Sequence, residues 1–412
     1  MRTKHLLYIV FSLFLLAGCK DDIQTVQFST AVQDGNEITL KWTPSDMSGF
    51  KYYRIMRADD GLHFNTINNV DSVGSDAFDK NICTYTDSNF PYVDSVYYKI
   101  IAFGDEIISS PNLCVHINKP ITISENISNA YVMPDEKKIL VFGYNGSSSY
   151  MYLYDYVTNK LINKMRLDVY SSGSTVFFGK YNNKYEFYFF DSWNDKIEIY
   201  NGLTLTKITD MSYWGNYPMF ATNNNGTIYS NDESSYTYLI NRKNLTTTTY
   251  QGATYIEKLY YMNVNNKLLG TTSYYNKVVV YALGDTGNIT SEYIKNISYS
   301  SNPVYVENSN LIYCGNNGIK KIINTDTWQE NTLPFPDNVD NEFMYLYSAK
   351  NVIYACTGYE NKLYCYSMTD FKLIKTINLR FVPTKLLSDS NYLFFCGYYN
   401  GSYIIDKIKL VE

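Results

Sequence analysis

The fold of this chain is decided by a stretch near its C-terminal end, which reads Cys365-Tyr366-Ser367-Met368-Thr369-Asp370-Phe371-Lys372-Leu373-Ile374-Lys375-Thr376-Ile377. Two runs rich in aromatic and aliphatic residues flank a short polar segment. Such runs on either side of a polar turn are typical of two neighbouring antiparallel strands. The stretch therefore predicts a strand, a turn and a second, outer strand.

The first run of this stretch recurs along the chain. Its other copies are Leu153-Tyr154-Asp155, Ile199-Tyr200-Asn201, Leu239-Ile240-Asn241, Val280-Tyr281-Ala282, Ile322-Ile323-Asn324 and, last, Ile404-Ile405-Asp406. From the first copy to the one at Tyr366, successive middle positions are 46, 40, 41, 42 and 43 residues apart. A repeat of ~40–45 residues is that of the four-stranded blades of a β-propeller. Each copy follows another strand-like run, so the pattern predicts seven blades in residues 118–412.

The last copy differs from the others because the chain ends at Glu412 without a further outer run. An unpaired edge there would be exposed unless a strand from the other end of the domain completed the blade. Residues Pro120-Ile121-Thr122-Ile123-Ser124 are the candidate for this closing strand. The region resembles seven-bladed propellers of the YVTN and quinoprotein-like kind, notably from Tyr366 to Ile374. It lacks the regular Gly-His to Trp-Asp signature of WD40 repeats.

Residues 24–117 predict a separate β-sandwich. Short alternating runs lie at residues 38–42, 52–56 and 96–102, separated by turn residues. This part resembles a fibronectin type III domain, in which a tryptophan of the second strand packs against a tyrosine-containing later strand. Trp42 and Tyr97 or Tyr98 occupy those places, and we expect Trp42 to be a core residue. With 44 tyrosines and only 18% charged residues, the composition also favours an all-β protein.

The first residues indicate export. A basic start precedes an apolar run from Leu6 to Leu16, which predicts a signal peptide over residues 1–18. Leu16-Ala17-Gly18-Cys19 resembles the lipobox of bacterial lipoproteins, which implies lipidation of Cys19 at the start of a stub, residues 19–23. Lys20, Asp21 and Asp22 look like a signal for export to the outer membrane surface. We expect a lipid-anchored outer-membrane protein on the cell surface, with the inner leaflet of that membrane as the alternative.

Chemistry-bearing residues are scarce in the propeller region. Both histidines beyond the signal peptide, His63 and His116, lie in the sandwich region, which excludes Ser-His-Asp, Cys-His and His-bearing metal sites in residues 118–412. No metal, dinucleotide or phosphate-loop motif occurs, so we expect no metal, no cofactor and no enzymatic activity. An acid–base carboxylate pair remains an alternative, with candidates Asp191, Asp195, Asp232, Glu233 and Glu360. A Cys356–Cys365 bridge also stays open.

Aromatic residues in the predicted turns are the candidate binding residues. Turns between the second and third strands of a blade meet the blade-to-blade connections on one face of a propeller. Those segments carry Trp193, Trp214, Tyr217, Tyr274, Tyr275, Tyr299, Tyr359, Tyr398 and Tyr399. Exposed rings there suit binding of a glycan or of an envelope or surface protein. A structural scaffold and a carboxylate-based polysaccharide lyase or hydrolase are the alternatives. The net charge of −5 argues against nucleic acid.

Overall fold

The computed structural model describes residues 26–69, 80–146, 148–167, 175–191, 194–213, 219–223, 225–231, 236–252, 256–272, 277–297, 303–316, 319–334 and 343–410. The chain divides into two compact units, Met1–Lys119 and Pro120–Glu412. Apart from one short 3-10 helix, Pro134–Glu136, the elements in these ranges are strands, which confirms the all-β prediction. Within the same ranges, no helix has the length and apolar character needed to cross a bilayer.

The first unit consists of two sheets around one core. One sheet contains β1 (Phe28–Asp34), β2 (Glu37–Trp42) and β5 (Thr84–Asp87), and the other contains β3 (Tyr52–Ala58), β4 (Asn65–Asn69), β6 (Ser95–Phe103), β7 (Ile107–Ser109) and β8 (Leu113–His116). Every second residue of β6 is buried, as expected for a strand with one face on a core. Trp42 is buried, as predicted, and its ring packs edge-to-face against Tyr53 with the ring centroids 5.4 Å apart. Tyr98, not Tyr97, is the fully buried tyrosine of β6.

The second unit is built from four-stranded groups, each called a blade and named by its first strand. The strands are β10 (Asn126–Met133), β11 (Lys138–Tyr144), β12 (Ser149–Asp155), β13 (Lys160–Leu167); β14 (Thr175–Tyr181), β15 (Lys184–Asp191), β16 (Lys196–Asn201), β17 (Lys207–Ser212); β18 (Met219–Thr222), β19 (Thr227–Asn231), β20 (Tyr236–Asn241), β21 (Thr246–Gln251); β22 (Lys258–Met262), β23 (Lys267–Thr272), β24 (Lys277–Leu283), β25 (Ile289–Asn296); β26 (Val304–Glu307), β27 (Leu311–Asn316), β28 (Ile319–Asn324), β29 (Glu330–Thr332); β30 (Tyr345–Ala349), β31 (Val352–Cys356), β32 (Lys362–Ser367), β33 (Leu373–Asn378); and β34 (Pro383–Ser388), β35 (Tyr392–Tyr399), β36 (Ser402–Lys409) with β9 (Ile121–Ile123).

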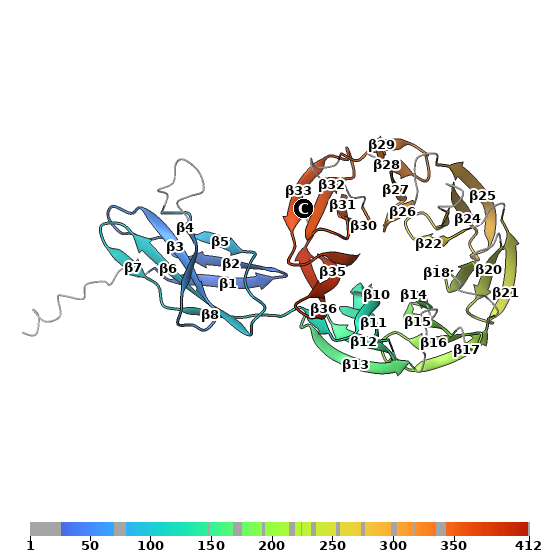
Figure 1. Cartoon of the computed structure of the whole chain (residues 1–412), viewed down its shortest axis with the longest axis horizontal. Coiled ribbons are helices and arrows are strands. Elements are labelled where there is room, and N and C mark those ends of the chain that lie inside the picture. The colour runs from blue at the N-terminus through green and yellow to red at the C-terminus, as the bar shows by residue number, and fades with distance from the viewer. Residues whose placement is uncertain are drawn as a thin grey trace, which may run out of the picture. The chain divides into compact units, whose positions relative to one another are not determined.

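Figure 1 shows these blades arranged in a ring, with their first strands toward the centre and their fourth strands on the rim. The arrangement is that of a β-propeller. The repeated sequence stretch forms the third strand, the turn and the fourth strand of the β30 blade, with Phe371 in the left-handed region at a φ of 56°. Hydrophobic clusters combine strands of neighbouring blades, so the middle strands are buried on both faces. This explains why these strands are apolar almost throughout.

The ring closes as the sequence predicts. Strand β9, from the start of the second unit, pairs antiparallel with β36, and its register places Ile121 opposite Ile405 and Ile123 opposite Tyr403. Ile121 and Ile123 are each 2% exposed and belong to a cluster that joins the β34 blade to the β10 blade. The pairing removes the free edge of β36. It is the one contact that ties the two ends of the ring together by backbone hydrogen bonds among the described strands.

The cysteines of the β30 blade are not bridged. Cys356 and Cys365 are both buried free thiols. In the register of β31 with β32, Cys365 lies opposite Tyr354, two residues from Cys356 along the strand. Such a diagonal pair is ~7–8 Å apart, beyond the reach of a disulfide without backbone movement. The two cysteines are therefore small core residues and do not form a disulfide.

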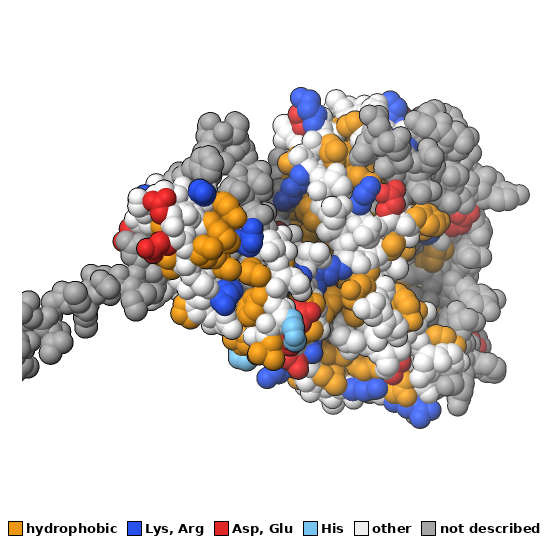
Figure 2. Space-filling view, turned by 60° about the vertical axis from the view of Figure 1, so that its left-hand side comes forward, with side chains coloured by type: hydrophobic (Ala, Val, Ile, Leu, Met, Phe, Trp, Pro, Cys, Tyr) orange, Lys and Arg blue, Asp and Glu red, His pale blue; other side chains and the backbone are white. Residues whose placement is uncertain are grey.

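Because successive strands of a blade run in opposite directions, the turns fall on two faces. The AB face carries the turns between first and second strands, and the BC face carries the turns between second and third strands together with the blade-to-blade connections. Figure 2 shows basic and acidic side chains scattered over the described part of the visible surface, without a continuous basic patch. The two faces of the second unit hold the two candidate sites.

Candidate functional site

The structure describes three of the predicted binding tyrosines. The remaining predicted site residues lie outside the described residues; they are Cys19, Lys20, Asp21, Asp22, Trp193, Trp214, Tyr217, Tyr274, Tyr275 and Tyr299. Tyr359, Tyr398 and Tyr399 all line one open cavity of about 790 Å³ on the BC face, between the β30 and β34 blades. Residues that are about forty apart in sequence thus share a single site, here called the groove.

The β31–β32 turn places Tyr359 on one side of the groove. Gly358 precedes it with a φ of 76°, a conformation that favours glycine. The Tyr359 backbone N–H donates a hydrogen bond to Oγ1 of the buried Thr357 at 3.2 Å, which fixes the turn. The tyrosine ring is 67% exposed. The local sequence therefore holds the backbone while it leaves the ring available to a ligand.

A two-residue hairpin turn presents the tyrosines on the other side. Asn400 and Gly401, which join β35 to β36, have φ angles of 47° and 86°. Positive φ at both central residues is the signature of a type I′ turn, for which Asn-Gly is the preferred pair. Tyr398 and Tyr399 end β35 directly before this turn. Tyr398 is 56% exposed, and its ring packs edge-on against Tyr403 at 5.0 Å.

The connection from β33 to β34 lies between these two turns. Its Phe381 is buried, with ring centroids 5.1 Å from Phe395 and 6.3 Å from Tyr399. It also lies directly over Gly397, where a Cβ atom would be 2.3 Å from the Phe381 ring and 2.5 Å from the carbonyl oxygen of Val382. Glycine is required at position 397 because the connection approaches the β35 backbone so closely.

Polar side chains alternate with the rings of the groove. Asn361 donates a hydrogen bond to the Leu379 carbonyl at 3.0 Å, and Glu360 accepts one from the Tyr364 hydroxyl at 3.1 Å. Lys362 lies 3.6 Å from the Glu360 carboxylate. Glu360 is the only carboxylate among the described lining residues. A pair of carboxylates, which acid–base hydrolysis of a glycoside requires, is therefore not assembled by the described part of the groove.

The other candidate carboxylates lie elsewhere. Asp191 is buried at the end of β15, where Asn194 donates a hydrogen bond to it at 2.6 Å and Lys196 lies at 3.7 Å. Asp195 lies in the following turn with a φ of 47°. Asp232 and Glu233 lie outside the described residues. Asp191 thus supports its own hairpin, an ordinary structural role for an aspartate.

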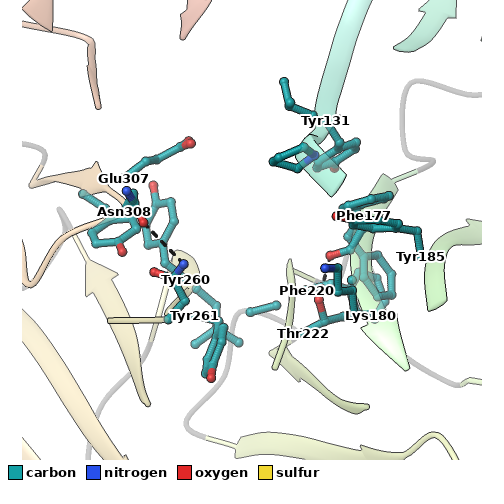
Figure 3. A pocket seen from close by; sticks show the side chains of 18 of the residues that line it. Tyr131, Phe177, Lys180, Tyr185, Phe220, Thr222, Tyr260, Tyr261, Glu307 and Asn308 are labelled. Carbon is teal, nitrogen blue, oxygen red and sulfur yellow. Dashed lines mark hydrogen bonds between the residues drawn. The ribbon is translucent and has the colours of Figure 1, made fainter. Parts of the chain in front are cut away.

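A second cavity, here called the channel, lies at the centre of the ring. It has a volume of about 680 Å³, and it is lined by the first strands of the blades and by residues of the turns on the AB face. Figure 3 shows Tyr131, Phe177, Lys180 and Phe220 on one side and Tyr260, Tyr261 and Glu307 on the other. The channel thus lies toward the face opposite the groove.

Aromatic rings make up much of the channel wall. Tyr131 stacks on Phe178 with centroids 5.0 Å apart, and Tyr260 packs against Tyr305 at 5.4 Å. Tyr347 lies beside Glu307, because β26 and β30 pair in parallel with these two residues in register. Burial raises the pKa of the Tyr131, Tyr260 and Tyr305 hydroxyls, and the nearby charge of Glu307 raises each further. These hydroxyls are neutral hydrogen-bonding groups in the physiological pH range.

Two opposite charges lie at this channel. Glu307 lines it, and the Lys385 ammonium lies beside it, 5.0 Å from the centroid of the ring of the lining residue Tyr131. Burial raises the pKa of the Glu307 carboxyl, and the positive charge of Lys385 partly offsets that rise. Burial lowers the pKa of the Lys385 ammonium, and the negative charge of Glu307 partly offsets that fall. Burial in turn raises the pKa of Cys396 to about 12, so this thiol stays protonated. The channel is therefore an environment that disfavours both charges, and each charge favours the other.

Sequence reasoning missed these channel residues. Glu307 and Lys385 are the single charged residues of the short strands Val304–Glu307 and Pro383–Ser388. The repeat pattern located the second and third strands of each blade but not the first, which lines the centre. The signal in the sequence that could have located them is a single charged residue within a short run that precedes the second strand of a blade. Among the described residues, no group of three metal-ligating side chains occurs at either site.

Comparisons with known proteins support the propeller fold. No family model and no curated protein matches the chain. The virginiamycin B lyase from Staphylococcus aureus has a TM-score of 0.53 at 13% identity, over 71% of this chain and 99% of that one. The RRP9 WD40 repeats have a TM-score of 0.52 at 11% identity, over 68% and 94%. Similarity at this level of identity shows the fold alone.

The similar structures include both enzymes and proteins that carry WD40 repeats. The dihydro-heme d1 dehydrogenase NirN has a TM-score of 0.49 at 9% identity, and the match covers 64% of this chain and 59% of the NirN chain. The lyase and the WD40 repeats share the same ring of blades with this protein. A propeller is thus compatible with catalysis and with binding alone. The residues of the groove and of the channel are the evidence that bears on function.

Proposed function

We propose that the groove binds a glycan and that the protein does so without catalysis. We further propose that the chain is a surface-exposed lipoprotein of the outer membrane, in which a fibronectin type III domain precedes a seven-bladed propeller. The observation that supports glycan binding is the set of three tyrosines, Tyr359, Tyr398 and Tyr399, which two blades bring to one cavity. Two of these rings are more than half exposed.

The chemistry of the groove suits a sugar. Exposed aromatic rings pack on the apolar faces of sugar rings, and amide and charged side chains beside them hydrogen-bond to hydroxyl groups. Asn361, Asn400 and Arg380 line the groove between the tyrosines. Tyrosine loses little rotamer freedom on binding, which favours its use in recognition. The single carboxylate of the described groove, Glu360, supports binding in preference to hydrolysis.

Glycan binding is tested with the soluble chain that begins at Lys20 and with a Tyr359→Ala/Tyr398→Ala variant of it. Glycans found on an array are titrated by calorimetry. Two aromatic contacts of ~0.5–1.5 kcal/mol each predict a loss of about fivefold or more in affinity. Tyr293→Ala, at a tyrosine on the outer strand β25 that is 51% exposed, is the matched control and should bind as the wild type does.

Three results would contradict the proposal. Unchanged affinity in the double variant would place the glycan site outside the groove. Absence of any glycan ligand, together with a protein recovered by crosslinking on intact cells through the groove, would favour a protein partner. Turnover of the bound glycan would contradict the non-catalytic part of the proposal. Dependence of that turnover on Glu360 would identify the catalytic carboxylate.

The anchor is tested separately, because it rests on the sequence of residues 1–22. Cys19→Ser should abolish incorporation of a labelled fatty acid and release the protein from membranes. Replacement of Lys20, Asp21 and Asp22 by alanine should keep the lipid but reduce access of an external protease to the protein on intact cells. Unaltered access would favour the inner leaflet of the outer membrane.

A further inference from the structure

The carboxyl group of Glu307 faces the channel without a partner. It makes no hydrogen bond and no ion pair with any residue in the described ranges, although burial disfavours its charged form. Figure 3 shows its side chain directed into the space between the two walls. Asn308, the next residue, donates a hydrogen bond to the Ser348 carbonyl at 2.9 Å, which holds this end of β26 against β30. A partly buried carboxylate without a hydrogen-bond partner is costly for a fold, so its retention calls for a ligand.

The ammonium group of Lys385 is only partly satisfied. It donates to Oδ1 of Asn129, and it lies 5.0 Å from the centroid of the Tyr131 ring. Asn129 is itself held in place, because its amide donates to the Tyr131 hydroxyl at 2.5 Å and to the Val176 carbonyl at 3.3 Å. An ammonium group has three donors. Within the described residues, one of them is used, so two remain for a ligand.

The charges of the channel point to a zwitterion. We propose that the channel binds a small aminocarboxylate, whose ammonium group pairs with Glu307 and whose carboxylate pairs with Lys385, between walls of tyrosine. The ligand class is that of amino acids and short peptides. This inference does not depend on the glycan proposal, because the channel and the groove are separate cavities with no lining residue in common.

Electrostatics favours a zwitterion over other small ligands. An organic cation would be attracted by Glu307 but repelled by Lys385. An organic anion would be attracted by Lys385 but repelled by Glu307. A ligand that carries both charges neutralises both groups, each of which burial holds in an unfavourable state. The tyrosine rings facing the channel, Tyr131, Tyr260, Tyr305 and Tyr347, supply cation–π contacts to the ligand ammonium. Lys180 also lines the channel, but Asp135 neutralises it at 2.7 Å.

The test uses linear aminocarboxylates of increasing length, from glycine to 6-aminohexanoate, and the chain from Lys20 onward with both units present. Affinity is measured by calorimetry for each length, since the best length reports the spacing between Glu307 and Lys385. Alkylamines and alkylcarboxylates of the same lengths carry only one of the two charges. We expect one or two aminocarboxylates to bind at least tenfold more tightly than the corresponding amine and carboxylate.

The variants Glu307→Gln and Lys385→Met remove one charge each with little change of shape. Each should lower the affinity for the best aminocarboxylate by at least tenfold. Glu330→Gln and Lys160→Met, at exposed positions on the outer strands β29 and β13, are the matched controls and should bind as the wild type does. Melting temperatures measured in parallel establish that all variants are folded.

The dependence of binding on pH gives a second readout. The titratable groups that face Glu307 are Lys385, Tyr131, Tyr260, Tyr305 and Tyr347. Affinity should fall in acid, as Glu307 is protonated, and in alkali, as Lys385 loses its proton. Glu307→Gln should remove the acid limb alone. The proposal is overturned if alkylamines bind as tightly as aminocarboxylates, if neither variant weakens binding, or if no aminocarboxylate binds the folded protein at millimolar concentration.

Discussion

The groove and the channel are built from the same blades in opposite ways. The groove presents exposed tyrosines from a turn and from the end of β35, and two of its polar side chains, Glu360 and Asn361, are hydrogen-bonded within the protein. The channel presents enclosed tyrosines from innermost strands, and its two charges lack full partners among the described residues. Binding groups in the two sites therefore differ in how much they lower the stability of the fold. Rings on turns cost little, whereas charges inside the ring are tolerated at the expense of folding free energy.

Opening the ring of blades should weaken the groove and the channel together and have the largest effect on stability. Ile123→Ala removes a residue of the closing strand β9 that is 2% exposed, and it should lower the free energy of unfolding by about 2–5 kcal/mol. Both binding activities should weaken together, because the groove lies in the β34 blade and the Lys385–Asn129 contact joins that blade to the β10 blade. Urea unfolding measures the effect. Ile374→Ala, 48% exposed on β33, is the control and should change it by no more than about 0.5 kcal/mol.

A change beneath the groove should separate the two sites. Gly397→Ala places a Cβ atom 2.3 Å from Phe381 and 2.5 Å from the Val382 carbonyl, so the β33–β34 connection must move. Strain of this kind costs about 1–3 kcal/mol. Glycan affinity should fall while aminocarboxylate binding persists. Calorimetry with both ligands checks this, and an equal loss of both would mean that the two sites are coupled through β35.

The cost of the channel charges can be measured by pH. Burial raises the pKa of Glu307 in the folded protein above its value in the unfolded chain. The folded state therefore binds more protons between these two values, and wild-type stability falls as the pH rises through that window. Glu307→Gln lacks this loss, so it should be more stable than wild type near neutral pH.

The same stability difference should shrink as the pH falls toward ~4.3, the ordinary pKa of a glutamate. Thermal unfolding at a series of pH values measures it, with Glu330→Gln as the exposed control. A variant that is less stable than wild type at neutral pH would show that the Glu307 charge supports the fold. Greater stability with loss of ligand is the pattern expected of a binding residue.

The smallest effect on stability is expected in the groove. Tyr398→Ala removes a ring that is 56% exposed and should change the free energy of unfolding by no more than about 0.5 kcal/mol. Glycan affinity should nevertheless fall several-fold, because one aromatic contact contributes ~0.5–1.5 kcal/mol to binding. A large loss of stability would instead give Tyr398 a structural role through its contact with Tyr403.

Local sequence explains much of the fold because each blade repeats the same local pattern. Strand periodicity and turn chemistry act over a few residues. The sequence therefore predicts the strand around Tyr366, its recurrence and the closing strand at Ile121 to Ile123. Trp42 was assigned to the core for the same reason. The first strands were harder to place, because some, such as Val304–Glu307, have only four residues. Short strands of this length carry too little periodicity to be recognised.

The candidate sites also combine features that local sequence determines with features that depend on the tertiary structure. By itself, the sequence determined which residue types occupy the turns, including Tyr359, Tyr398 and Tyr399 and the Asn400-Gly401 turn. Only the tertiary structure decided that these three tyrosines share one cavity and that Lys385 comes close enough to Glu307, which lines the channel, for their charges to interact. The physical reason is that ring closure sets the distances between blades. Residues from β26, β34 and β10 meet only when the last blade packs against the first, and that contact depends on the whole chain between them.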